Sequence, residues 1–254
     1  MRFASLGSGS SGNALLVEAG GVRLMIDCGF GLRDTVRRLQ RCHVEPESIN
    51  AIFITHEHTD HIGGTAAFAG KYRIPVWMSH GTRSALNGKL DKLDVLHTFD
   101  SHALLDLGDL QVQALPVPHD AREPVQFVVS NGAHRLAVLT DIGASTAYIE
   151  AQISGCDALV LECNHDLDLL YNGSYPYPLK QRISGRLGHL HNEAAAELLA
   201  AIDRSRLQHV IAAHLSQHNN HPDKARAALA QVLGCASDWI GLADQDEGFG
   251  WRSL

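Results

Sequence analysis

Short apolar runs, separated by turns rich in Gly, Ser and Asn, dominate the first half of the chain. The runs at residues 2–6, 14–18 and 22–26 predict an opening β-meander that turns at residues 20–21. Further strands are predicted at residues 51–54, 75–78, 111–116, 125–130 and 135–140. The first half is therefore expected to be rich in strands.

Apolar positions with helical spacing occur at residues 32–41 and 61–69, and the small residues of the second segment permit a close approach to the neighbouring loop. In the second half, helices are predicted at residues 145–153, 193–202 and 222–232, and strands at residues 158–162 and 210–213. No repeat, low-complexity tract or long linker divides the chain, so a single domain over residues 1–254 is expected. Strands inside and helices outside predict an α/β fold, a layered αββα sandwich.

The composition is that of an ordinary globular protein, with 45% hydrophobic and 19% charged residues. A net charge of −7 argues against a generally basic surface for nucleic acid. It does not exclude a phosphate substrate, because two divalent ions would add about four positive charges where that substrate binds. The unusual count is that of histidine, at 16.

The five cysteines form no CxxC pair, and their odd number fits reduced thiols better than a disulfide framework. No run of about 18 apolar residues occurs, and residues 1–13 lead into a Gly/Ser loop instead of a signal-peptide core. We therefore expect a cytoplasmic protein with no membrane partner.

The Gly/Ser loop at residues 7–13 permits three interpretations. A phosphate-binding P-loop is disfavoured, because the loop lacks the lysine of that motif and no helical pattern follows it. A loop at the rim of a metal site would offer backbone N–H groups and the hydroxyls of Ser8, Ser10 or Ser11 to an anion. A plain turn is an equally good interpretation.

The densest chemical signal follows the apolar run at residues 51–55. It is the hexapeptide His56-Glu57-His58-Thr59-Asp60-His61. A tight loop after a strand places His56 and His58 on one side, whereas Asp60 and His61 can face a second ion. Two adjacent metal sites are the leading hypothesis, and a solvated histidine-rich loop without a ligand is the alternative.

Three more residues of the right ligand type follow predicted strands: His119, Asp141 and His214. Taken alone, His119 could be a loop residue, and Asp141 could start a turn or cap the helix predicted at residues 145–153. Together with the first motif they complete a set of seven ligands for two ions.

These motifs resemble those of the metallo-β-lactamase superfamily, whose HxHxDH motif, later histidine, bridging aspartate and final histidine occur in the same order. The resemblance covers essentially the whole chain and implies the four-layer αββα metallo-β-lactamase sandwich. It also implies the ligand roles, with His56, His58 and His119 for one ion, Asp60, His61 and His214 for the other, and Asp141 bridging both.

Imidazole and carboxylate ligands suit borderline divalent ions, so Zn²⁺ is the first choice and Mn²⁺ or Fe²⁺ the alternatives. Two such ions activate water and polarise the attacked centre. Hydrolysis is therefore the predicted reaction, with Asp60 among the catalytic residues.

Several motifs are similar to those of the YycJ/WalJ group of the superfamily. They lie at residues 10–13, 118–121, 162–166, 175–176, 179–183, 188–192 and 214–220. The group is associated with 5′ to 3′ exonuclease activity on DNA, so the resemblance implies cleavage of phosphodiester bonds, with DNA as the partner. His191 departs from the pattern, since a small hydroxyl residue is common at its position.

A parallel similarity to ribonuclease Z implies a role for His189, which would act as a general acid or stabilise charge on the leaving oxygen. Glu162 would orient it. The alternative is a histidine at a helix N-terminus that binds the backbone.

Substrate contacts are predicted for nearby side chains that carry hydroxyl, amide, imidazole or cationic groups. They are Ser10, Asn164, His165, Lys180, Arg182, His191 and Asn219. Loop bracing is the alternative for the amides and for His165, and a solvated helix face is the alternative for the basic residues.

Two other functions fit the sequence. A small-molecule hydrolase would use the same metal pair on a cyclic phosphodiester, thioester or lactone, since the fold alone does not choose a substrate. A noncatalytic metal-binding scaffold is a more remote alternative, because such proteins should have lost at least one of the seven ligands.

Overall fold

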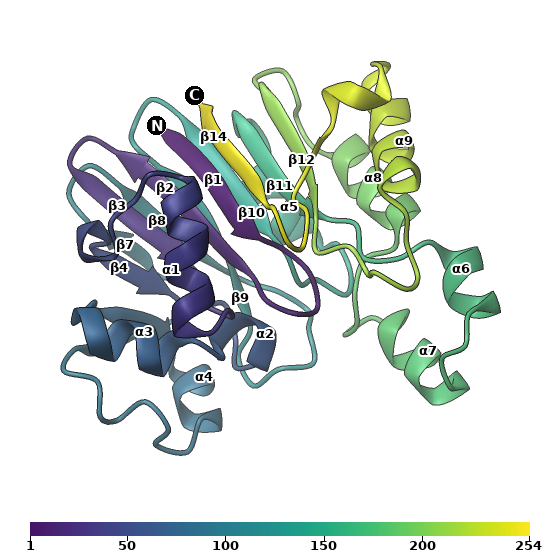
Figure 1. Ribbon diagram of the computed structural model, residues 1–254. Helices are drawn as coiled ribbons and strands as arrows, with labels where there is room; N and C mark the ends of the chain where they lie inside the picture. Colours follow the sequence, from purple (N-terminus) through teal and green to yellow (C-terminus); the bar gives the residue numbers. More distant parts are fainter.

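The apolar runs within residues 1–99, together with a strand near the C-terminus, form a seven-stranded sheet in a computed structural model that describes residues 1–254 (Figure 1). The strand order is β14-β1-β2-β3-β4-β5-β6, with antiparallel pairing from β14 to β3 and parallel pairing from β3 to β6. The strands are β1 (Arg2–Gly7), β2 (Ala14–Ala19), β3 (Val22–Ile26), β4 (Ala51–Phe53), β5 (Val76–Ser79), β6 (Leu96–Phe99) and β14 (Phe249–Ser253).

A second seven-stranded sheet has the order β13-β12-β11-β10-β9-β8-β7. Its strands β10 to β13 are parallel, and β7 to β10 are antiparallel. The strands are β7 (Leu104–Asp106), β8 (Gln111–Pro116), β9 (Val125–Ser130), β10 (Arg135–Leu139), β11 (Ala158–Glu162), β12 (His209–Ala213) and β13 (Gly241–Leu242).

Nine α-helices and two short 3-10 helices connect the strands. The α-helices are α1 (Leu32–Arg41), α2 (Thr59–Ile62), α3 (Thr65–Tyr72), α4 (His80–Ala85), α5 (Ala147–Ile153), α6 (Leu167–Asn172), α7 (Tyr177–Ile183), α8 (Asn192–Ala201) and α9 (Pro222–Leu233). The 3-10 helices are Pro46–Ser48 and Ser237–Trp239.

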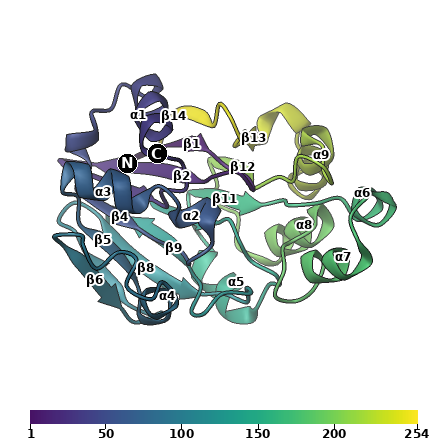
Figure 2. The same ribbon diagram turned by 60° about the horizontal axis from the view of Figure 1, so that its bottom comes forward.

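Three apolar clusters divide the molecule into four layers. Side chains of both sheets fill the central cluster, including Val17 and Phe53 from the first sheet and Phe127 from the second. The outer face of the first sheet packs against α1 and α3, and that of the second against α5, α8 and α9. Because neighbouring residues of a strand point to opposite faces, each sheet contributes to two clusters. The predicted αββα sandwich is confirmed (Figures 1 and 2).

Phe53 packs between the two sheets, three residues before the histidine-rich motif begins at His56. Its ring stacks on Trp77 at a centroid distance of 5.8 Å and meets Phe127 edge to face at 5.6 Å, and it is fully buried. Replacing Phe53 by Ala should lower the free energy of unfolding by about 3–5 kcal/mol, because the change leaves a cavity. Urea unfolding measures this loss beside Leu104→Ala, an exposed control; a loss below about 1 kcal/mol for Phe53→Ala would contradict the packing.

Most predicted elements agree with the structure to within two residues, but the helix predicted at residues 61–69 is split. Helix α2 ends at Ile62 and α3 begins at Thr65. A Cβ atom on Gly64 would clash with the carbonyl oxygen of Phe30, so the small residues do permit the predicted close approach. The elements that the sequence did not predict are the two 3-10 helices and α4, α6, α7, β6, β7, β13 and β14.

Candidate metal centre

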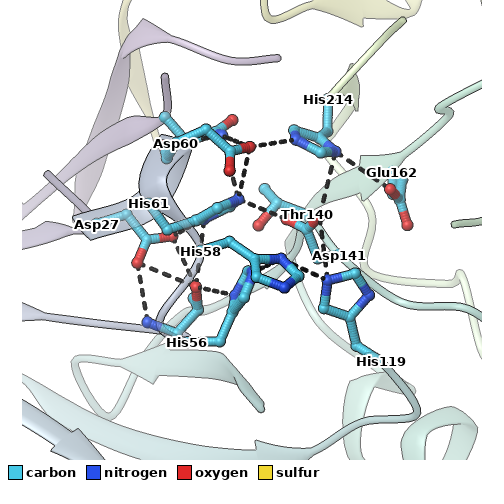
Figure 3. Close-up of polar contacts among 12 residues, drawn as sticks. Asp27, His56, His58, Asp60, His61, His119, Thr140, Asp141, Glu162 and His214 are labelled. Carbon is cyan, nitrogen blue, oxygen red and sulfur yellow. Dashed lines mark hydrogen bonds and ion pairs between the residues drawn. The ribbon is translucent and has the colours of Figure 1, made fainter. Parts of the chain in front are cut away.

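The candidate centre lies where several strands end. Strand β4 leads into the histidine-rich motif, β10 is followed by Asp141, β11 ends at Glu162, and β12 is followed by His214. Parallel strands present their carboxyl ends at one edge of a sheet, which is where α/β proteins commonly bind ligands. The side chains that follow these strands point toward one another (Figure 3).

His56, His58 and His119 form the first group of three side chains. Nε2 of His56 lies 3.0 Å from Nδ1 of His58, and Nε2 of His119 lies 3.3 Å from the same atom. One nitrogen of each ring lies within 4.8 Å of those of the other two. His56 and His119 are buried, whereas His58 is partly exposed. Three imidazole nitrogens that converge in this way suit a divalent ion.

Asp60, His61 and His214 form the second group. Oδ2 of Asp60 lies 3.3 Å from Nε2 of His61 and 3.4 Å from Nε2 of His214. Asp60 and His61 come from the short helix α2, whereas His214 adopts a left-handed backbone conformation with φ of 53°. A non-glycine residue in this region is uncommon and is often found at functional sites.

Asp141 lies between the two groups. Its Oδ2 is 2.9 Å from Nε2 of His61, and its Oδ1 is 3.8 Å from Nε2 of His119. Oδ2 is buried and makes no hydrogen bond of good geometry. A buried carboxylate that has one oxygen without a donor, and whose two oxygens lie near ring nitrogens of the two groups, fits a metal-binding cluster.

The electrostatics of the cluster also fit a bound cation. Burial opposes a positive charge on the ring of His214. The negative charge of Asp141 and the hydrogen bonds to Asp60 and Glu162 outweigh burial and raise the pKa of His214 to about 10. Burial also opposes ionisation of Asp141, but His214 and His61 hold the pKa of its carboxyl well below the usual range. Without a cation, protons on the rings must balance the buried carboxylates. Metal binding would take over this role and release the protons.

Asp27 and Thr55 support the cluster from behind, and the sequence analysis missed both. Oδ2 of Asp27 lies 2.7 Å from Nδ1 of His61, and the backbone N–H and the hydroxyl of Thr55 donate to Oδ1 of Asp27 at 2.8 and 3.0 Å. The hydroxyl of Thr55 also lies 2.9 Å from Nδ1 of His56. These contacts orient both rings so that Nε2 faces the centre. The available signal was a polar residue directly after the apolar strand at residues 22–26.

Replacing Asp27 by Asn should weaken metal binding by about 10- to 100-fold, because a carboxylate that holds a ligand histidine raises its basicity and fixes its orientation. Competition with a chromophoric chelator measures the affinity. Asp106→Asn, on an exposed residue of β7, is the matched control. An affinity equal to that of the wild type would show that Asp27 does not orient His61 for a metal.

The Gly/Ser loop contacts the cluster directly. The hydroxyl of Ser8 accepts a hydrogen bond from the backbone N–H of His214 at 3.0 Å and donates to Oδ1 of Asn13 at 3.1 Å. Nδ2 of Asn13 lies 3.3 Å from the backbone oxygen of Asp60, and Ser10 lines the cleft above the cluster. Of the three interpretations, the position at the rim of the candidate metal site agrees with the structure.

His189 and Glu162 form a pair at the edge of the cluster. Nδ1 of His189 lies 2.7 Å from Oε1 of Glu162, whose Oε2 accepts hydrogen bonds from the backbone N–H groups of Ile142 and Leu190. Burial opposes charge on His189, but Glu162 and Asp141 outweigh it and raise its pKa. The predicted orienting contact is present, and the catalytic roles of both residues stay predictions.

The structure brings only two of the seven predicted substrate contacts, Ser10 and Arg182, to the cleft of the metal cluster. Nζ of Lys180 donates to backbone oxygens of Tyr171 and Gly173. His191 caps the N-terminus of α8 and lines a neighbouring pocket.

Three of the predicted contacts, Asn164, His165 and Asn219, are buried. Nδ2 of Asn164 donates to the backbone oxygen of His214, and the backbone of Asn219 accepts from that of Asp166. Backbone partners of this kind are not visible in a sequence. Asn164 therefore braces the loop that carries His214, and the alternative interpretation as a brace describes its position.

None of the helices is long and apolar enough to cross a membrane.

The sequence pattern of the beta-lactamase superfamily domain matches residues 22–214. The chain belongs to the metallo-β-lactamase superfamily, and its fold and His/Asp cluster indicate divalent metal ions as cofactors. Exodeoxyribonuclease YycJ of Bacillus anthracis is 34% identical over 92% of this chain and 89% of the relative. Exodeoxyribonuclease WalJ of Streptococcus pneumoniae is 32% identical over 95% and 91%, respectively. Within the superfamily, the chain is thus a hydrolase of the YycJ/WalJ group, whose members are named as nucleases.

Solved structures agree on the fold. The metallo-beta-lactamase fold protein YhfI from Bacillus subtilis has a TM-score of 0.75 at 17% identity, covering 99% of this chain and 98% of that one. Zn²⁺-bound PqqB from Methylobacterium extorquens has a TM-score of 0.73 at 17% identity, with full coverage of both chains. At this level of identity the likeness concerns the fold alone.

Proposed function

We propose that the protein is a dinuclear metal-dependent hydrolase that cleaves phosphodiester bonds in DNA and removes nucleotides from the 5′ end. The convergence of two groups of three ligands on Asp141, at the base of one open cleft, carries the proposal. Relatives over more than nine-tenths of the chain are named exodeoxyribonucleases. One domain over residues 1–254 would supply all seven ligands.

The donor set favours zinc. Five of the seven side chains are imidazoles and two are carboxylates, a mixture that suits Zn²⁺ and also accepts Mn²⁺ or Fe²⁺. When bound, two such ions would activate water and neutralise charge on the attacked phosphate. His56, His58 and His119 would hold one ion, Asp60, His61 and His214 the other, and Asp141 both.

His189 would supply the proton for the leaving oxygen. Glu162 accepts the proton of Nδ1, so that Nε2 is left for the cleft, and its negative charge favours the protonated ring that a general acid requires. Glu162 is buried and also bound by two backbone N–H groups, so it holds His189 in a fixed orientation.

Digestion of end-labelled DNA tests the proposed function. Single- and double-stranded oligonucleotides, with and without a 5′-phosphate, are incubated with protein loaded with Zn²⁺ or Mn²⁺. The expected result is release of mononucleotides from the 5′ label first, only when metal is present. Protein that holds two metal ions and cleaves no DNA would contradict the proposal and direct the search to cyclic phosphodiesters, thioesters and lactones.

A further inference from the structure

One wall of the cleft is formed by α7 and by the turn that joins it to α6. Tyr175, Leu179 and Arg182 of this segment line the same cleft, of about 450 Å³, as Asp141 and His214. Helix α7 contains no buried residue, and both helices lie at the edge of the molecule, outside the two sheets (Figure 2). Packing of the core therefore does not explain the residues of this segment.

Residues 169–188, which begin within α6 after Asp168 and end beyond α7, differ in composition from the rest of the chain. Residues 169–188 contain three of the five tyrosines and three cationic side chains, and none of the 28 acidic residues. The whole chain has a net charge of −7. Cationic groups beside aromatic rings are typical of surfaces that bind single-stranded nucleic acid, because the rings stack on bases and the cations contact phosphates.

Of the three tyrosines, only Tyr175 lines the cleft. The hydroxyl of Tyr171 lies 3.0 Å from that of Ser184, and Tyr177 is 64% exposed and points to solvent. The ring of Tyr175 is half-buried and meets that of His218 edge to face, at a centroid distance of 6.0 Å and an angle of 63°. Tyr175 therefore presents an aromatic ring beside the metal cluster that is not stacked on its aromatic neighbour.

The structure also holds this wall in place. Nζ of Lys180 donates to the backbone oxygens of Tyr171 and Gly173 at 2.8 and 2.7 Å, which ties α7 to the turn that carries Tyr175. Nε of Arg182 donates to Asp120 at 2.6 Å, and the Arg182 side chain is 63% exposed. Only Nε of the guanidinium donates to Asp120, so the two Nη groups remain to donate to a phosphate.

We propose that this wall is a subsite for the end of a single-stranded nucleic acid, in which Tyr175 stacks on the base beside the scissile phosphate. Arg182 contacts the backbone phosphate of the same strand. The inference rests on the proposed nuclease function and adds that the end of the substrate must be unpaired. A base must be unpaired to enter the cleft, so a single-stranded end is a better substrate than a blunt duplex end.

Steady-state digestion by the metal-loaded protein tests the subsite. Tyr175→Ala should raise the KM for a single-stranded oligonucleotide about tenfold or more, with kcat within about threefold of the wild type, because one stacked base is lost. Tyr175→Phe should behave like the wild type, since it keeps the ring. Tyr177→Ala removes an exposed tyrosine of the same segment outside the cleft, and it is the matched control.

An oligonucleotide with an abasic residue at the nucleotide beside the first cleaved bond separates stacking from a structural effect. The wild type should show the same rise in KM on this substrate, and Tyr175→Ala should show no further rise. An unchanged KM for Tyr175→Ala, or equal sensitivity of both proteins to the abasic residue, would overturn the subsite while leaving the nuclease function intact. A metal-loaded wild type that cleaves no DNA would overturn both.

Discussion

Replacing Asp141 by Ala should abolish metal-dependent cleavage of DNA, with a fall in rate of more than about 10³-fold. Of the two carboxylates among the seven proposed ligands, Asp141 is the one that lies near ring nitrogens of both ligand groups. Its loss should therefore weaken the binding of both ions. The fall in metal affinity should exceed the 10- to 100-fold fall expected for Asp27→Asn, because Asp27 only supports a ligand. Metal content per chain, measured with the rate on the same sample, should fall in parallel.

A control separates this effect from misfolding. The buried carboxylate lies at the end of β10 and not within an apolar cluster, so the variant should keep its circular dichroism spectrum and cooperative unfolding. Asp106→Asn, far from the cluster, should keep full activity and full metal content. An Asp141→Ala protein that is folded and retains more than a tenth of the wild-type rate would contradict the bridging position.

Replacing His189 by Ala should lower the rate of the chemical step by about 10²- to 10⁴-fold, as expected for loss of a general acid. Metal content should not change, because His189 is not among the seven proposed ligands. Single-turnover digestion of a labelled oligonucleotide measures this step. Glu162→Gln should also lower the rate, since the amide removes the charge that favours a protonated His189.

A substrate with a better leaving group tests directly whether His189 acts as a general acid. A p-nitrophenyl ester of thymidine 5′-monophosphate releases a phenolate that needs little protonation, so His189→Ala should lose far less activity on this substrate than on DNA. His80→Gln, on an exposed histidine at the start of α4, is the control. An equal loss on both substrates would exclude the role as general acid and assign His189 to binding or to support of the fold.

The sequence predicted the sandwich because most of its strands are built on short apolar runs that are bounded by turn residues. Strands such as β9 and β11 are buried on both faces and show this pattern clearly. Helices α6 and α7 were missed, because they span six and seven residues and bury almost no side chain. Without an apolar stripe, a short helix carries no periodic signal.

The candidate ligands could be found from the sequence because they are adjacent or follow strands, whereas their supports depend on tertiary contacts. Asp27 reaches His61 across the parallel pair β3 and β4, which the sequence does not show. Lys180 was expected at the substrate, but its partners are backbone oxygens of a turn. Side-chain chemistry alone does not distinguish a contact with phosphate from a contact with a carbonyl group.

Stepwise metal loading of a single stripped sample tests the metal-dependent nuclease function most directly. Zn²⁺ or Mn²⁺ is added in fractions of an equivalent, and bound metal and nucleotide release from single-stranded DNA are measured at each step. Release should appear as the metal content rises toward two ions per chain, and it should disappear when a chelator removes them. Two bound ions per chain without any release of nucleotides would contradict the proposed function.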